Sequence, residues 1–240
     1  MSLVDADSRP YSEVRALFAA VLATTAEDLE VPACPRWDVH DLVAHQVHQL
    51  EGAIQGDFPL QDAIDALLAP DAAERASALA RQEAWIAQGV RARRATPLLA
   101  LINAWTQLDA DAPSEVLAGL FPDITVHFFD LLGAAGATGY RDHAVVIPAL
   151  TFWLQQSSVR FERATQQSLR LEVVDGRDER TVIGEGEAEV VVSGSAYELL
   201  RAITGRRSRR QAEALRWSRA DEIAAMAFPA YGWRPEDLDE

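Results

Sequence analysis

Length, composition and charge exclude several classes of protein. The chain has 240 residues, of which 49% are hydrophobic and 25% charged, as in ordinary globular proteins with a buried core. No apolar run approaches the roughly 20 residues of a membrane span, and the N-terminus lacks the pattern of an export signal. We therefore expect a cytoplasmic protein without a membrane partner. The net charge of −15 argues against a nucleic-acid partner, which would require a basic surface.

The first 140 residues show helical periodicity, with short connections that favour a helical bundle. Capping residues, prolines and glycines mark where the helices begin and end. The expected helices are Tyr11 to about Glu30, Asp38 to about Gln55, Asp71 to Arg94, Thr96-Pro97 to about Leu108, and Pro122 to the glycines from Gly133 onward.

After residue 141 the pattern changes to a mixture of helices and β-branched runs. Helices are predicted from Asp142 to about Ser158 and from Ser195 to Ile203, and strands at Ser168–Val174, Thr181–Ile183 and Ala188–Val192. The Asp175-Gly176 dipeptide is typical of a turn between two strands. The fold class is therefore expected to be α+β, with domains at residues 1–141 and 142–240.

Three side chains have the spacing of a metal site. Asp123 and His127 are four residues apart, which places them on one face of a helix. His45, from another helix, would complete three ligands and leave a coordination position open, as in catalytic zinc sites. From the residues alone, a core histidine and a surface Asp–His pair remain alternatives. Zinc is the expected metal, although nickel or iron could use the same ligands.

The sequence around these residues resembles one enzyme family. The segments CPRWDVHDLVAHQV and DITVHFFDLLGAAG are similar to those of the mycothiol-dependent maleylpyruvate isomerase family. The resemblance implies a DinB-like four-helix bundle in which His45 and a Glu-x-x-x-His pair, here Asp123 and His127, bind a divalent metal. It also implies mycothiol as the thiol cofactor. The segment SGSAYELLRAITGR resembles the small α/β, sterol-carrier-like second domain of many members.

The basic residues fit the same resemblance loosely. All 22 are arginines, a composition typical of GC-rich genomes such as those of many mycothiol-producing actinobacteria. A C-terminal stretch rich in arginine is either a solvated basic face or a binding surface for an anionic substrate. Its members are Arg201, Arg206, Arg207, Arg209, Arg210, Arg216 and Arg219.

Other residues near the three ligands have open roles. Asp130 either orients a ligand histidine or forms a buried hydrogen bond. His48, which shares a helix face with His45 and Asp41, is either a fourth ligand or a polar lining residue. Trp37 either packs in the core or stacks on substrate. We interpret Cys34 as a small apolar residue without an activating partner, so that a reactive thiol must come from outside.

These patterns favour a metal-dependent isomerase or S-transferase that uses mycothiol on a small, electrophilic, anionic substrate. A non-catalytic metal- or small-molecule-binding protein is the alternative. Metal-assisted hydrolysis is a third interpretation, and it would require Asp130, Asp41 or His48 as general base. The partners expected are the thiol and the electrophile, and a homodimer remains open. The sequence does not identify catalytic or cofactor-binding residues.

Overall fold

The computed structural model describes residues 9–69, 71–219, 224, 228–229 and 232–240. They divide into two compact units, one with residues up to 66, 72–139 and Glu240, and the other with residues 67–71 and 140–239. The first unit is helical and the second combines helices with a four-stranded sheet, so the fold class is α+β as predicted. The assignment of separate roles to residues 1–141 and 142–240 stays a prediction.

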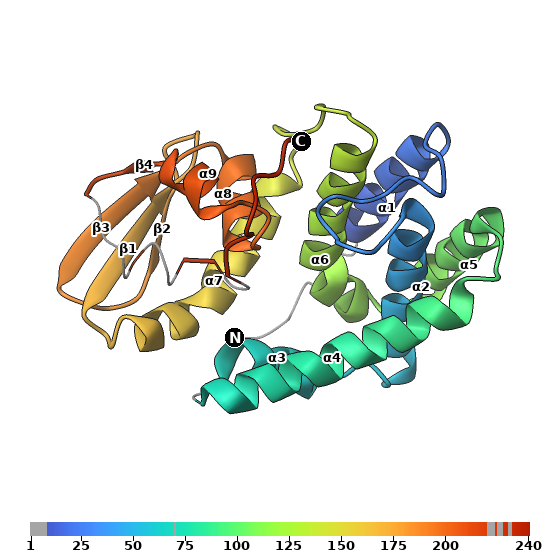
Figure 1. The fold of residues 1–240 in the computed structure, drawn as a ribbon, viewed down its shortest axis with the longest axis horizontal. Helices are drawn as coiled ribbons and strands as arrows, with labels where there is room; N and C mark the ends of the chain where they lie inside the picture. Colours follow the sequence, from blue (N-terminus) through green and yellow to red (C-terminus); the bar gives the residue numbers. More distant parts are fainter. Residues whose placement is uncertain (1–8, 70, 220–223, 225–227, 230–231) are drawn as a thin grey trace. The chain divides into compact units, whose positions relative to one another are not determined.

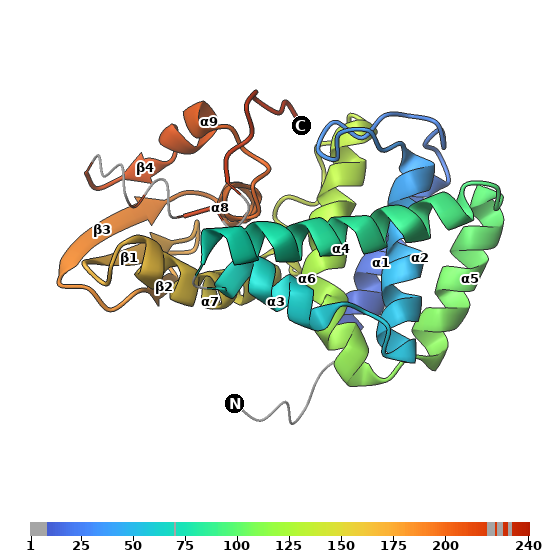
Figure 2. The ribbon, with the colours of Figure 1, turned by 60° about the horizontal axis from the view of Figure 1, so that its bottom comes forward.

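Four helices of the first unit pack into a bundle (Figures 1 and 2). The helices of this half are α1 (Arg9–Leu22), α2 (Val39–Gln55), α3 (Leu60–Leu68), α4 (Ala72–Arg93), α5 (Leu98–Asp111) and α6 (Ser114–Ala134). Helix α2 packs against α5 and α6, and α1 packs against α6. The rings of Phe18 on α1 and Trp105 on α5, 5.2 Å apart, close the bundle. Helix α4 lies outside it against α2.

Helix α2 has the ends that the sequence predicts. The Asp38 side chain accepts a hydrogen bond from the Asp41 backbone N–H at 2.7 Å, which satisfies a donor of the first turn. Gly56 ends the helix in the left-handed conformation, with φ of 77°, and its N–H donates to the Gly52 carbonyl. Both ends of the helix that carries His45 are therefore fixed by local sequence.

Helix α6 begins earlier than predicted. Pro122 was expected to open the helix, but it lies inside a helix that starts at Ser114. A proline inside a helix costs about 3 kcal/mol or more, because it removes one hydrogen bond and crowds the preceding turn. Leu117 and Leu120 before it and Ile124 after it are buried, and each contributes about 1.5–3 kcal/mol. The free energy gained by burying apolar side chains before and after Pro122 thus outweighs the cost of the proline inside the helix.

Helix α6 is also the one helix, among the residues that the structure describes, with the length and hydropathy of a membrane span. The sequence expectation that no run comes near such a length therefore needs correction. The mean hydropathy of its window is 1.4, but 72% of that window is buried inside the structure. Such burial is typical of the core helix of a bundle.

Other boundaries differ from the sequence prediction. Helix α1 ends at Leu22 rather than near Glu30, because the Thr25 hydroxyl donates to the Val21 carbonyl at 2.8 Å and competes with the helical backbone. Helix α4 confirms the predicted segment and ends one residue earlier, at Arg93. Three short elements were not predicted, and these are α3, α9 (Arg209–Glu213) and β4 (Arg216–Trp217).

The second unit is built on a mixed sheet with strand order β2-β1-β3-β4. Its elements are α7 (Val146–Ala164), β1 (Leu169–Val174), β2 (Arg180–Ile183), β3 (Ala188–Ser193), α8 (Ala196–Ile203), α9 and β4. Strand β1 pairs antiparallel with β2 and parallel with β3, and β3 pairs antiparallel with β4. Val190 and Val192 are buried while Val191 between them is not, so one face of β3 lies in the core. Helix α7 packs against α8 and β2.

Candidate metal centre

The structure brings the three predicted ligands together. Helices α2 and α6 pack side by side, and both histidines approach the same carboxylate oxygen of Asp123. His45 Nε2 lies 3.7 Å from Asp123 Oδ2, and His127 Nε2 lies 3.7 Å from the same atom. The two imidazole rings are 4.9 Å apart between centroids. A single small ion can therefore face all three side chains.

The donor set fits a divalent metal such as zinc. Zinc takes His nitrogen and carboxylate oxygen at about 2.0–2.2 Å, so two ligands of a tetrahedral ion lie roughly 3.4 Å apart. The observed 3.7 Å separations need a contraction of only a few tenths of an ångström. His45 is 3% exposed and His127 6%, while the Asp123 side chain is 31% exposed. The two histidines are thus enclosed and the carboxylate borders solvent.

Asp130 orients His127. Its Oδ2 lies 2.9 Å from His127 Nδ1, and the carboxylate is fully buried. Because a carboxylate only accepts hydrogen bonds, Nδ1 must carry the hydrogen, which leaves the lone pair of neutral imidazole on Nε2. This is the nitrogen that faces Asp123. Of the two roles left open for Asp130, the geometry therefore supports the orienting one.

Cys34 has the polar neighbours that the sequence did not reveal. Its thiol donates to Asp130 Oδ2 at 3.3 Å, and its sulfur lies 3.8 Å from His127 Nδ1. The interpretation of Cys34 as an apolar residue without a partner was therefore wrong. Cys34 and His127 are 93 residues apart in the chain, and no local pattern joins them.

Two further residues shape the centre. Trp37 packs beside both imidazoles, with ring centroids 5.1 Å from His45 and 6.1 Å from His127. Buried Gln46 donates from its amide nitrogen to Asp123 Oδ2 at 3.2 Å and so holds the carboxylate. Gln46 was not predicted as part of the centre, because its contact with Asp123 depends on how α2 packs against α6.

The charges around His127 favour a cation at this position. Burial disfavours imidazolium, but the Asp123 carboxylate and the hydrogen bond to Asp130 outweigh it and raise the pKa of His127 to about 10. Burial likewise disfavours the Asp123 carboxylate, yet His127 and His45 together hold the pKa of Asp123 far below its usual range. Without a metal, a proton therefore supplies the positive charge that the two carboxylates attract.

Zinc must displace that proton, which gives a pH-dependent prediction. Because the raised pKa keeps His127 protonated at pH 7, zinc binding should release a proton, and the apparent zinc affinity should rise about tenfold per pH unit from pH 7 to 9. Competition titrations with a chromogenic chelator at each pH measure this slope. An ordinary histidine, with a pKa near 6.5, would give an affinity that is flat above pH 7.5 or so.

The shorter carboxylate leads to a second prediction. The sequence resemblance implies Glu at the position of Asp123, and the observed separations are slightly wider than a bound ion requires. One additional methylene lets the carboxylate reach further, so Asp123→Glu should bind zinc at least as tightly as the wild type. Metal analysis after desalting tests this, with Asp123→Asn as the charge-removing control. Loss of zinc from a folded Glu variant would mean that the backbone is built specifically for Asp.

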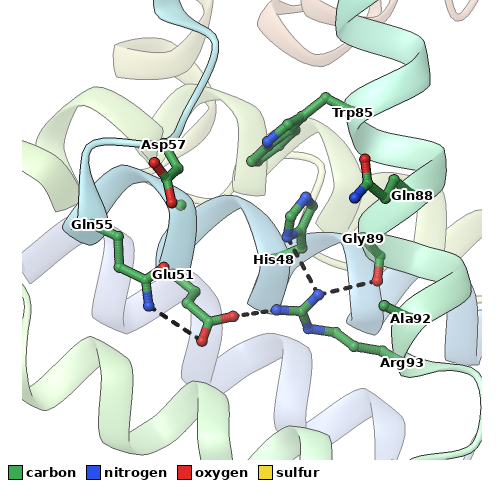
Figure 3. A pocket seen from close by; sticks show the side chains of 10 residues that line it. His48, Glu51, Gln55, Asp57, Trp85, Gln88, Gly89, Ala92 and Arg93 are labelled. Carbon is green, nitrogen blue, oxygen red and sulfur yellow. Dashed lines mark hydrogen bonds and ion pairs between the residues drawn. The ribbon is translucent and has the colours of Figure 1, made fainter.

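Two of the residues considered as an additional ligand or a base, His48 and Asp41, lie outside this group. His48 stacks on Trp85 of α4, with 3.8 Å between ring centroids (Figure 3). A Cβ at Gly89 would lie 1.9 Å from His48 Cδ2, so the imidazole occupies space that only glycine leaves on α4. Asp41 is buried and paired with Arg94 at 2.6 Å. Neither His48 nor Asp41 belongs to the group that faces Asp123.

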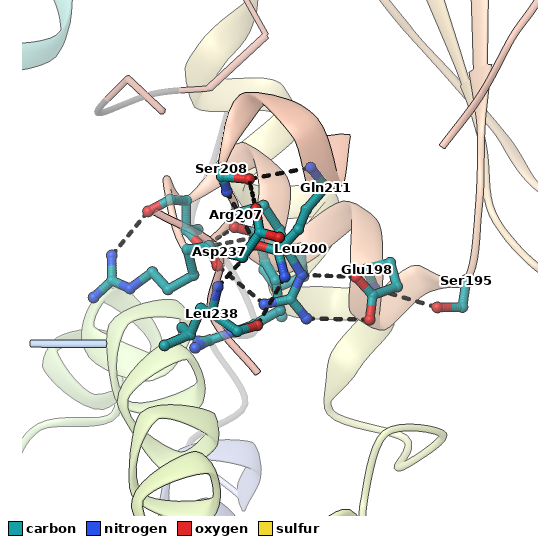
Figure 4. Close-up of polar contacts among 11 residues, drawn as sticks. Ser195, Glu198, Leu200, Arg207, Ser208, Gln211, Asp237 and Leu238 are labelled. Atoms are coloured by element: carbon teal, nitrogen blue, oxygen red, sulfur yellow. Dashed lines mark hydrogen bonds and ion pairs between the residues drawn. The ribbon is translucent and has the colours of Figure 1, made fainter. Parts of the chain in front are cut away.

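Most of the C-terminal arginines are engaged within their own unit. Arg207 binds Glu198 through Nε at 2.8 Å and through a terminal nitrogen at 3.1 Å (Figure 4). Arg209 pairs with Glu213 at 2.9 Å, and Arg210 pairs with Asp237. Arg201 is fully buried. These contacts favour a structural role for the stretch over a single anion-binding face.

Comparisons with known proteins find the same fold in one enzyme. The structure is similar to the crystal structure of the mycothiol-dependent maleylpyruvate isomerase, with a TM-score of 0.54 and 15% sequence identity over 92% of this chain and 96% of that one. A histidine-to-alanine variant of that isomerase gives a TM-score of 0.51 and 16% identity at the same coverage. No family model and no curated protein matches the sequence. The resemblance of the two sequence segments is therefore confirmed at the level of fold.

Proposed function

We propose that this protein, which has the fold of the mycothiol-dependent maleylpyruvate isomerase, is a metal-dependent enzyme that uses mycothiol on a small electrophile. One observation carries the proposal: His45 and His127 direct their Nε2 atoms toward one oxygen of Asp123. Three ligands leave a coordination position for a fourth group, which distinguishes a catalytic site from a closed structural one. Zinc is the proposed metal, and nickel and iron suit the same donors.

Each residue of the centre has a defined task in this proposal. His45 and His127 supply neutral nitrogen donors, and Asp123 supplies one negative charge. Asp130 fixes the His127 hydrogen on Nδ1, and Trp37 shields the imidazoles on one side. A divalent metal held there would lower the pKa of a thiol that enters the open position.

An activated thiol can lead to two outcomes with the same residues. Thiolate addition to an electron-poor double bond forms a carbon–sulfur bond and leaves a carbon–carbon single bond that rotates. Breaking the new bond expels the thiol and gives cis–trans isomerisation, whereas keeping it and protonating the carbon gives an S-conjugate. We therefore propose isomerase or S-transferase activity as one class of chemistry.

No observation favours metal-assisted hydrolysis. Of the three bases considered, Asp130 is engaged with His127, Asp41 with Arg94, and His48 stacks on Trp85. A hydrolase would require a base that reaches a water at the open position. The non-catalytic binding protein remains the alternative that the experiment must distinguish.

The test is a turnover assay with matched controls. Purified protein loaded with zinc should convert maleylpyruvate, or conjugate one of a panel of unsaturated and halogenated electrophiles, when mycothiol is present. Activity should be lost on chelation and recovered on adding zinc. His40→Gln is a suitable control, because His40 contacts the Thr96 carbonyl rather than the centre. A fully loaded protein that is inactive across the panel would support the binding protein instead.

A further inference from the structure

The second unit contains a small cavity that none of the metal-centre residues lines. Its volume is about 110 Å³. Three segments surround it: the loop before α7, the turn between β1 and β2, and the start of α8. This volume suits a single small group, since pockets for larger organic ligands usually measure about 300–1,000 Å³.

Two arginines line this cavity. Arg141 precedes α7, and its guanidinium carbon lies 5.0 Å from the ring centroid of Tyr197 on α8. Tyr197 is itself buried, so the stacking restricts where the Arg141 side chain lies. Arg177 comes from the β1–β2 turn, which is held by hydrogen bonds from the Arg177 and Glu179 N–H groups to Asp175 Oδ1. Arginines from separate segments thus meet at one small space.

Neutral donors complete the lining. The Nδ1 atom of His143 accepts a hydrogen bond from the Val145 N–H at 3.4 Å, so a neutral imidazole carries its hydrogen on Nε2. Ser195 caps α8, and the N–H groups of the first helical turn add partial positive charge. Asp142 also lines the cavity, so its one negative charge stands against the two positive charges of Arg141 and Arg177.

We propose that this cavity binds a small oxyanion, the carboxylate of a small organic acid or a free phosphate. Arg141 and Arg177 provide planar forks that match either group, and His143 adds a further donor. This local excess of donors occurs in a protein whose net charge is −15. Because its residues all belong to the second unit, the site is independent of the metal centre, and either proposal can fail without the other.

A titration followed by NMR tests this site. Maleate and inorganic phosphate are added separately to the full chain at constant ionic strength, and the amide signals of Gly176 and Ala196 are followed. At least one anion should shift these signals saturably. Arg177→Gln should weaken that binding severalfold, as expected for losing an ion pair at an exposed arginine. Arg180→Gln is the matched control, since Arg180 is an exposed arginine paired with Glu172 on the adjacent strands.

The two anions separate the two sources of the ligand. Tighter binding of maleate identifies a small organic acid, and tighter binding of phosphate identifies the free ion. Arg141→Gln should weaken binding similarly. If that variant does not fold because it loses its stacking on Tyr197, the result for Arg177→Gln, a change at an exposed residue, decides the test. Shifts that never saturate, or equal weakening in Arg180→Gln, would overturn the proposal.

Discussion

Replacing His127 with Ala should leave the purified protein unable to retain zinc after desalting, while the wild type keeps one ion per chain. The substitution removes a metal-binding nitrogen, His127 Nε2, which lies 3.7 Å from Asp123 Oδ2. It also removes the imidazole that contacts the buried Asp130 carboxylate. The loss of affinity should exceed the 10–100-fold that is typical of losing an outer-shell partner, because a direct ligand is gone. Metal analysis of the desalted protein measures it.

The control for this experiment is His40→Gln, which should retain zinc like the wild type. His40 lies on the same helix as His45, but its Nε2 contacts the Thr96 carbonyl at 2.8 Å. Circular dichroism of each variant shows whether the fold is kept. A folded His127→Ala protein that binds zinc as tightly as the wild type would rule out the proposed ligand set.

Asp130→Asn should weaken zinc binding about 10–100-fold without removing a ligand. The amide has nearly the shape of the carboxylate but lacks its charge, so it no longer enforces the hydrogen on His127 Nδ1. The same change removes one cause of the raised pKa of His127, so the pH at which zinc affinity becomes constant should fall. Chelator competition at several pH values measures both effects.

Cys34→Ala provides the comparison for Asp130→Asn. Cys34 donates to the same Asp130 oxygen but is not needed to orient His127, so its loss should change zinc affinity only slightly. If Cys34→Ala weakened zinc binding as strongly as Asp130→Asn, the sulfur itself would be acting on the metal. In that case the ligand set would have to be revised.

The sequence predicts what local spacing determines. The cap at Asp38 and the end of α2 near Gln55 were predicted from adjacent residues, and the register of α2 follows from its apolar stripe. Asp123 and His127 lie on one helix face wherever the helix begins, because they are four residues apart. These features could be read from a few adjacent residues.

Contacts between distant segments could not be predicted in this way. Cys34 meets Asp130 across 96 residues, and no spacing in the chain encodes that distance. Pro122 was misread because its local preference for a helix start is weaker than the burial on both sides of it. The small cavity near Arg141 and Arg177 also depends on three segments that only the folded sheet and helices bring together.

The most direct measurement of the central claim is a thiol titration of the cobalt-substituted protein. Cobalt(II) takes the same donors as zinc and absorbs visible light, and a thiolate that enters its coordination sphere adds a sulfur-to-cobalt charge-transfer band in the near ultraviolet. If His45, Asp123 and His127 leave a position open, mycothiol should produce this band saturably with one equivalent per cobalt. A protein that holds one cobalt per chain and shows no such band at saturating mycothiol would contradict an open, thiol-binding metal centre.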